Sequence, residues 1–507
     1  MYMHVCVCVC VCSAAKVYCI YDVPHIIKNI RNNLMTHDLV VDDNVVSFKY
    51  LRHMFDEEQQ STLRLAPKLT KLHFDIRLFR KMNVRLAAQV LSRSSAVAIR
   101  TYVHFGRLEP SALPTADFVE NINQLFDVLN SMCVSAKNKW KKPLSSTSVD
   151  QFKYLDECVA WIGRWRFVHP VTGASKASLP CQTGLQQTIL GVRSAAAELL
   201  QNHSFKYVLT SRFNQDAIEN FFGTVRSKGI NNDTRTTVEY QSAVKHIAVN
   251  WIMEQPEQGA NCLPDDDAVF NVIDELGRGH AAALETAAGN CTVSVSDEQR
   301  LLTAAAVNAV SCETSADLTV VTDWPDIFDL TDVDANIVAY ICGYLCMKVN
   351  RISDCADCSS SFLSYRDSHT IASAEIQKHE IFIHFKNFDW AKHGLQKPSY
   401  AMFCLCSSVE KAVRLNIESC VNAQHGVVKQ LFDVVLTTVD VYSYSLPSVC
   451  ALHQLQQIRH VVLLYLRLRI HHFVRIRNRE LKDLQLKQKQ NVHVGKKNRK
   501  LEKISHR

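Results

Sequence analysis

Apolar and polar positions alternate with the period of an α-helix most clearly between residues 211 and 226. One face collects apolar residues at i, i+3, i+4 and i+7, namely Ile218, Phe221, Phe222 and Val225. The adjoining flank carries two carboxylates one turn apart, then a glycine and a guanidinium, namely Asp216, Glu219, Gly223 and Arg226. The pattern predicts an amphipathic helix with one buried face, for which Asn214 is a suitable N-cap. A surface helix with solvated charges has the same pattern, so that alternative stays open.

A short β-branched and aromatic run at residues 17–21 predicts a buried strand. Pro24 then opens a helix whose apolar positions have helical spacing, at Ile26, Ile27, Ile30 and Leu34. Asp22 lies at the C-terminal end of the predicted strand, where carboxylates in α/β sheets point into the crevice that binds ligands. An aspartate that only shapes a strand-to-helix turn fits the same pattern.

Helical patterns dominate the rest of the chain. After helical material at residues 63–101, a further helix has its apolar positions at Phe118, Ile122, Leu125, Phe126 and Leu129. Asn123 and Asp127 lie one turn apart on the polar side of this helix. The segment after residue 250 is rich in Ala, Asp and Ser and has weak periodicity, which indicates a linker or a variable insertion. Apolar patterning returns at residues 337–345, and we expect helices from there onward.

Composition places the chain among folded intracellular proteins. Of its 507 residues 47% are hydrophobic, and the net charge of +7 is too small to indicate nucleic acid by itself. The 19 cysteines follow no secretory signal, so we expect reduced thiols in the cytosol or nucleus. No apolar run has the length of a membrane span, so no membrane partner is expected. Positive charge gathers in the last 27 residues, where nine Lys and Arg stand against two acidic residues.

The first twelve residues, MYMHVCVCVCVC, repeat the pair Val-Cys. A GT dinucleotide repeat encodes this pair when it is translated in one frame. We therefore expect residues 1–16 to be a translated simple repeat outside the fold, and the chain to be truncated at its N-terminus.

Several segments, taken in order, resemble the P-element-type DNA transposases, a family that often carries an N-terminal THAP-type zinc finger. The segments are Asp22–Asn32, Leu63–Thr70, Lys81–Ala87, Thr115–Asn130, Leu209–Gly223 and Tyr340–Tyr344. No single segment decides the resemblance, which depends on the ordered set.

The resemblance implies a fold of the class α/β + α. An incomplete RNase H-like catalytic core, with a mixed sheet, is interrupted by a mostly helical GTP-binding insertion domain and followed by a helical C-terminal region. The expected partition is a simple repeat (1–16), core (17–45), GTP-binding insertion (46–205), core with the third-acid helix (206–250), linker (251–335), helical C-terminal domain (336–480) and basic tail (481–507).

The resemblance also implies a metal site. In the family three carboxylates hold two Mg²⁺ ions, which activate water for DNA cleavage and then the freed 3′-hydroxyl for strand transfer. By motif position Asp22 is the second carboxylate and Glu219 the third, so both are candidate catalytic residues and metal ligands. Carboxylate oxygens suit Mg²⁺, and two ions clamp the attacking and leaving oxygens. The side-chain oxygens of Asp22 and Glu219 should then lie on the order of 4–8 Å apart.

The first carboxylate of the family should lie on a strand well before Asp22, but residues 1–21 contain no Asp or Glu. The chain therefore has two of the three ligands and no THAP-type finger. We expect a transposase that does not cut DNA in this form. The alternative is a non-catalytic nuclear protein that binds DNA or nucleotide on a reused transposase scaffold.

For GTP, the resemblance points to a set of candidate residues: Lys68, Val84 with its neighbour Asn83, Asn123, Asp127 and Asp216. A carboxylate is a natural partner for the two N–H groups on the guanine edge, and Lys68 suits a phosphate as a point charge. Where the family is expected to have Lys, position 83 is Asn, which removes one cation.

The remaining expectations concern partners and further sites. The resemblance implies transposon-end and target DNA as partners, a homo-oligomer and a nuclear location. The patch Lys496–Lys500 fits nuclear import or contact with DNA phosphates, and a solvated tail is the alternative. Cys355 and Cys358 have zinc-ligand spacing that Cys404 and Cys406 could complete, although chance pairs are expected among 19 cysteines.

Overall fold

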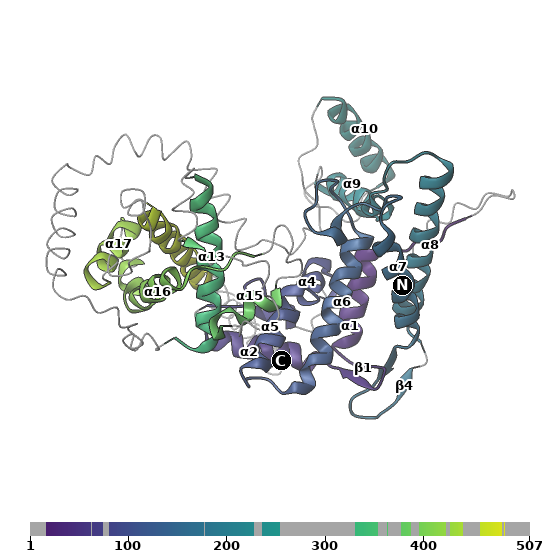
Figure 1. Cartoon of the computed structure of the whole chain (residues 1–507). Coiled ribbons are helices and arrows are strands. Elements are labelled where there is room, and N and C mark those ends of the chain that lie inside the picture. The colour runs from purple at the N-terminus through teal and green to yellow at the C-terminus, as the bar shows by residue number, and fades with distance from the viewer. Residues whose placement is uncertain are drawn as a thin grey trace, which may run out of the picture. The chain divides into compact units, whose positions relative to one another are not determined.

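A computed structural model describes most of the chain: residues 17–61, 63–74, 81–176, 178–227, 236–253, 330–352, 362–363, 377–386, 395–421, 426–439, 457–478 and 481. The chain forms two compact units, Met1–Asn271 and Val272–Arg507 (Figure 1). Each unit is described by itself below.

Helices make up most of the first unit. They are α1 (Val23–Leu34), α2 (Phe48–Gln60), α4 (Val84–Val90), α5 (Arg93–His104), α6 (Leu113–Leu129), α7 (Val149–Gly163), α8 (Pro180–Asn202), α9 (Asp216–Ser227) and α10 (Thr237–Met253). As Figure 1 shows, α1 lies beside α6, and α1 also packs against α4 and α8. The helix expected after Pro24 is α1, with proline in its first turn.

The first unit also contains a small sheet of four strands in the order β2-β1-β3-β4. The strands are β1 (Asp38–Val41), β2 (Asn44–Val46), β3 (Arg166–Val168) and β4 (Ser175–Lys176), and every pairing is antiparallel. Asp42 and Asp43 form the two-residue turn between β1 and β2 and both have positive φ, as a type I′ hairpin requires. This antiparallel sheet is not the mixed sheet expected of an RNase H-like core.

The strand predicted at residues 17–21 is not formed, and this prediction is wrong. The segment runs along α8 instead: the Tyr21 N–H donates to Thr188 Oγ1 at 3.0 Å. At Gly191 the Cys19 carbonyl comes so close that a Cβ would lie 2.4 Å from it. The β-branched and aromatic residues of the segment therefore pack on a helix with a glycine gap. A strand also needs a neighbouring strand, which the local sequence pattern does not reveal.

The core of the first unit is built around α6. Its predicted apolar face is confirmed at Ile122, Leu125 and Leu129, which are fully buried, whereas Phe126 is only half-buried. Aromatic side chains also pack in this core: the ring centroid of Phe118 lies 5.3 Å from that of Trp165. The site described below is attached to the C-terminal end of this rigid helix.

The second unit is mostly helical in its described residues, as the sequence predicted for the C-terminal region. Its helices are α13 (Asp332–Ile352), α15 (Ile381–Lys386), α16 (Tyr400–Val421) and α17 (Val427–Thr438), and residues 457–478 are also helical. Where the structure describes the chain, no helix is both long and apolar enough for a membrane span.

Candidate active site

Asp22 is fixed by the start of α1. It is the N-cap residue: its Oδ2 accepts a hydrogen bond from the His25 N–H at 3.0 Å, and Pro24 presets the first turn. The residue is only 8% exposed. The polar cap of a helix thus holds a buried carboxylate in one orientation.

The start of α9 meets this carboxylate from a distant part of the sequence. The Gln215 N–H donates to Asp22 Oδ1 at 2.8 Å across 193 positions. Just before α9, Thr210 donates to the carbonyl of Val128 at the end of α6, at 2.7 Å. Asn214 donates to the Asn130 side chain at 2.7 Å, so it is not the N-cap that the sequence predicted. The end of α6 therefore places α9 beside α1.

Only part of the apolar face predicted for this helix is buried. Val225 packs against Ala243 of α10, with Phe221 half-buried beside them. Ile218 and Phe222, however, are 51% and 42% exposed. The sequence predicted one fully covered face, but α10 covers only the C-terminal half of α9 among the described residues.

His25 links the two predicted metal ligands. Its Nδ1 lies 2.8 Å from Asp22 Oδ2, and its Nε2 lies 3.3 Å from Glu219 Oε1. One imidazole ring therefore spans the gap between these carboxylates. The sequence reading did not single out His25; its signal was the Asp-x-x-His spacing in the first turn of α1, which puts both side chains on one helix face.

Three carboxylates shape the electrostatics of this site. Burial would raise the pKa of Asp22, but hydrogen bonds from His25 and the Gln215 N–H outweigh it, so the pKa is lowered. The pKa of Asp216 is raised, first by burial and then by the negative charges of Asp22 and Glu219. Burial lowers the pKa of Lys28, against the attraction of Glu219 and Asp22. Asp22, Asp216 and Glu219 thus form one acidic cluster, next to a buried lysine.

The chemistry of this cluster suits a hard cation. Mg²⁺ prefers oxygen ligands and binds through one or two carboxylates together with water and substrate phosphates. Among the described residues, no three side chains are already arranged as metal ligands. Asp22 and Glu219 therefore offer the right atoms, with His25 between them.

The predicted nucleotide residues are distributed over several elements. Asn123 Nδ2 donates to Asp127 Oδ2 at 3.3 Å on α6, so these two side chains are directly linked. Asn83 caps α4, its side chain accepting from the Leu86 N–H at 3.1 Å, and Val84 is the first residue of that helix. Lys68 lies in the turn before Lys71–Phe74, whereas Asp216 belongs to the acidic cluster. α1 packs against α4, which begins at Val84, and against α6, which carries Asn123 and Asp127.

Glu58, which the sequence reading missed, holds the segment that leads to Lys68. Its carboxylate is fully buried and accepts from the Leu65 N–H at 2.7 Å and the Ala66 N–H at 3.2 Å. Burial raises its pKa to about 7, against these hydrogen bonds. Its apparent place on the polar face of α2 gave no sign of this role.

Only two of the four proposed zinc ligands lie among the residues that the structure describes. Cys355 and Cys358 lie outside the described residues, as does the patch Lys496–Lys500. Cys404 and Cys406 are both buried on α16, where a spacing of two residues points side chains to opposite sides. Cys404 lies beside Tyr400 and Cys406 beside Cys342, so these two thiols do not face a common ion.

Three family models match the chain in order. They are the TNP-like GTP-binding insertion domain at residues 24–143, the TNP-like RNase H C-terminal domain at 211–245, and the C-terminal domain of DNA transposase THAP9 at 329–475. The acidic helix α9 lies within the second match, and Asp22 lies two residues before the first.

The chain is also similar to the following two proteins. The "Transposable element P transposase" of Drosophila melanogaster is 26% identical over 266 residues, which cover 51% of this chain and 34% of that protein. The chain thus spans about a third of that relative's length. A solved "Drosophila P element transposase strand transfer complex" shows 28% identity and a TM-score of 0.41, over 46% of this chain and 52% of that one. On the three family matches and the sequence relative, the chain belongs to the family of P-element-type transposases.

Proposed function

We propose that Asp22 and Glu219 are two of the metal ligands of a site for DNA cleavage and strand transfer, and that these two carboxylates alone do not complete the site. One observation carries the proposal: Asp22, Asp216 and Glu219 converge around His25, although Asp22 and Gln215 lie 193 positions apart. A purely structural role for Glu219 does not require it to face the buried cap of another helix.

The residues of the chain prepare this site for Mg²⁺. A bound ion supplies an activated water or 3′-hydroxyl and neutralises charge on the phosphate. Hydrogen bonds from α1 and Gln215 keep Asp22 ionised, as the lowered pKa requires of a metal ligand. His25 holds Glu219 on the side of Asp22, so Asp22 and Glu219 are the side chains that would hold the ion.

GTP assistance is proposed at α6 and the segments around it. The hydrogen bond from Asn123 orients the Asp127 carboxylate, which can accept from the N–H groups of guanine. Lys68 supplies a point charge for phosphate. The side chain of Asn83 caps α4 and does not replace the cation expected at that position. Val84 and Asp216 complete the proposed set of GTP-binding residues.

Metal binding tests the proposal directly. We expect the 507-residue polypeptide to bind Mn²⁺, used as a paramagnetic substitute for Mg²⁺, and Glu219→Ala to weaken that binding at least tenfold because one of two carboxylate ligands is lost. Titration followed by electron paramagnetic resonance measures both affinities. Glu157→Ala, at an exposed glutamate of α7, is the matched control and should bind as the wild type does. Equal affinity in Glu219→Ala and Glu157→Ala would refute the metal site.

The same polypeptide should show no metal-dependent nicking of DNA, because it supplies two of the three carboxylates that the two-metal mechanism uses. A gel assay with Mg²⁺ or Mn²⁺ measures this. Cleavage that disappears in Glu219→Ala would show that two carboxylates are sufficient here.

A second candidate function is a non-catalytic nuclear protein that binds DNA or nucleotide. It is favoured by the position of His25, whose ring contacts both carboxylates and lies between them. DNA or GTP binding without Mn²⁺ binding at Glu219 would select this candidate over the first.

A further inference from the structure

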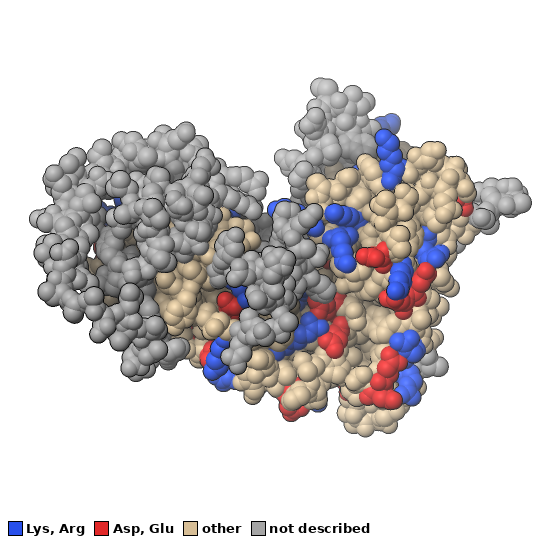
Figure 2. Space-filling model, viewed as in Figure 1, with Lys and Arg blue, Asp and Glu red and all other residues tan. Residues whose placement is uncertain are grey.

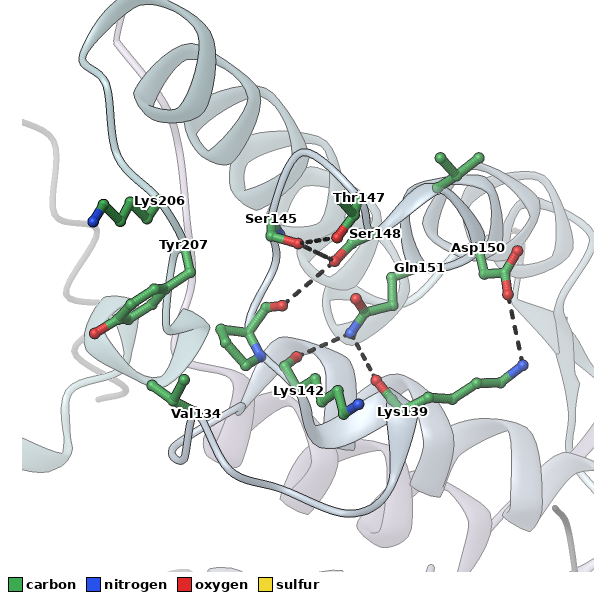
Figure 3. Close-up of a pocket in the computed structure, with 12 residues that line it drawn as sticks. Val134, Lys139, Lys142, Ser145, Thr147, Ser148, Asp150, Gln151, Lys206 and Tyr207 are labelled. Carbon is green, nitrogen blue, oxygen red and sulfur yellow. Dashed lines mark hydrogen bonds and ion pairs between the residues drawn. The ribbon is translucent and has the colours of Figure 1, made fainter. Parts of the chain in front are cut away.

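A basic cavity lies on the first unit, outside the acidic cluster and the proposed nucleotide residues. Its volume is about 520 Å³, and the loop after α6, the first turn of α7 and the segment after α8 line it. Figure 3 shows Lys206 and Tyr207 on one side, the hydroxyls of Ser145 and Thr147 on another, and Lys139 and Lys142 on the loop between α6 and α7.

The backbone around this cavity is firmly held. Leu144 and Val208 exchange two backbone hydrogen bonds, of 3.0 and 2.8 Å, which join the wall before α7 to the wall after α8. Gln151 is 5% exposed, and its Nε2 donates to the carbonyls of Lys139 and Lys142 at 3.2 and 3.0 Å. A buried amide thus fixes the loop from which these two lysines project.

The charge of the lining is strongly one-sided. Three lysines face one carboxylate, Asp150, which pairs with Lys139 at 3.7 Å. Lys142 and Lys206 form no ion pair with any described residue, and both are exposed. On the face that Figure 2 draws, Lys and Arg lie beside Asp and Glu over much of the described surface. The described lining of the cavity therefore carries more positive than negative charge.

We propose that this cavity binds the phosphodiester backbone of DNA. Lysines and hydroxyls are the side chains that contact phosphate oxygens without reading base sequence. Tyr207 is 43% exposed and offers an aromatic face to a sugar or base. The only carboxylate of the described lining is paired with Lys139, so the lining offers no unpaired carboxylate to the two N–H groups of a guanine edge. These features favour a DNA strand over a mononucleotide.

The inference extends the proposed action on DNA but uses none of the residues of the acidic cluster. Its test is the affinity of the full-length protein for a fluorescein-labelled DNA duplex, measured by anisotropy between roughly 50 and 200 mM salt. The test variant is the double substitution Lys142→Gln and Lys206→Gln. The matched control is Lys153→Gln, which removes the same kind of charge from α7 outside the cavity.

We expect the double variant to bind at least tenfold more weakly at the low salt concentration. The slope of log affinity against log salt should fall by about two, since each lysine–phosphate contact contributes roughly 0.9 to it. Lys153→Gln should keep the wild-type slope. A double variant that matches Lys153→Gln would overturn the assignment, as would a wild type that does not bind the duplex.

Competition identifies the ligand class. Polyglutamate and unlabelled duplex are compared at equal concentrations of negative charge, with ATP as a third competitor. The proposal requires the duplex to displace the probe at a concentration at least tenfold below that of either other competitor, because polyglutamate offers no sugar or base to Tyr207 and ATP is a single nucleotide. Equal displacement by polyglutamate or ATP would assign the cavity to another anion. Mn²⁺ binding at Glu219 is measured separately, so failure of this inference leaves the proposed metal site standing.

Discussion

The pKa values of two buried carboxylates, Asp22 and Glu58, are shifted in opposite directions. Asp22 is kept charged because a side chain and two backbone N–H groups surround it, and its pKa is lowered. Glu58 also accepts backbone hydrogen bonds, yet complete burial prevails and raises its pKa from 4.5 to about 7. Asp22 keeps a small exposure to water and Glu58 has none, so hydrogen bonds prevail at Asp22 and burial prevails at Glu58.

Glu58 should therefore make the stability of the first unit depend on pH. Its pKa is higher in the folded state than in the unfolded chain, so folding favours the protonated form, and stability falls as pH rises from 4.5 to about 7. The loss is about 3 kcal/mol over this window. Glu58→Gln should remove this component, as measured by urea unfolding at a series of pH values.

Glu57→Gln provides the comparison for Glu58, because Glu57 is the neighbouring residue and pairs with Arg107 at 4.0 Å near the surface. Its pH profile should parallel that of the wild type. A Glu58→Gln profile that also parallels the wild type would show that Glu58 does not titrate in this range.

Sequence reasoning at this scale found residues with a motif but missed residues defined by their environment. Asp22 and Glu219 were predicted and do lie on either side of one histidine. His25 and Glu58 were missed because their roles depend on which distant groups surround them. Burial of Glu58 beside Leu65 is a property of the fold, and a polar position on a helical pattern does not encode it.

At the scale of elements, a buried charge network holds the helices of the second unit together. Glu410 of α16 is fully buried and accepts from Arg469 at 2.7 and 2.9 Å and from the Tyr465 hydroxyl at 2.9 Å. Arg414 binds the same carboxylate at 2.9 Å and also Asp334 of α13. The network connects α13, α16 and the helical residues 457–478.

Glu410→Gln should destabilise the second unit by about 3–5 kcal/mol, because it leaves the buried Arg469 without its counter-charge. Urea unfolding followed by circular dichroism measures the change. Glu418→Gln, at an exposed position of the same helix, should stay within about 0.5 kcal/mol of the wild type. If both variants unfold alike, the network contributes specificity of packing and little stability.

The elements with strong helical periodicity were the ones that the sequence predicted well. α1 and α6 were recognised because their apolar spacing is a local property, visible in a dozen residues. Residues 17–21 were mistaken for a strand because their true partner, α8, lies about 170 positions later, as the bond from Tyr21 to Thr188 shows. Asn214 was mistaken for a cap for a similar reason, since Asn130 engages its side chain.

The whole molecule consists of two compact units, and the proposed sites for GTP and metal lie in the first of them. Ligands that bind one unit stabilise that unit only. The composition of the chain did not reveal this division. The boundary between the units falls at residue 271, within the segment whose weak periodicity predicted a linker or a variable insertion, and most of that segment lies outside the described residues.

Calorimetry of the full protein should therefore show two unfolding transitions. GTP should raise the midpoint temperature only of the transition that belongs to the first unit. At about one hundred times its dissociation constant GTP adds about 2.7 kcal/mol, a shift of several degrees. Asp127→Asn should abolish the shift, whereas Asp117→Asn, an exposed aspartate of the same helix, should preserve it. A shift that survives in Asp127→Asn would place GTP elsewhere.

The hydrogen bond between Gln215 and Asp22 also orders events during folding. In an unfolded chain, closing a loop of 193 positions carries a large entropic cost, and a single bond does not offset it. Once α6 has formed, Thr210 and Asn214 attach to its end and bring α9 to the N-terminus of α1. We therefore expect the acidic cluster to assemble late, after the helices between its parts are in place, and a partly folded chain to lack the proposed metal site.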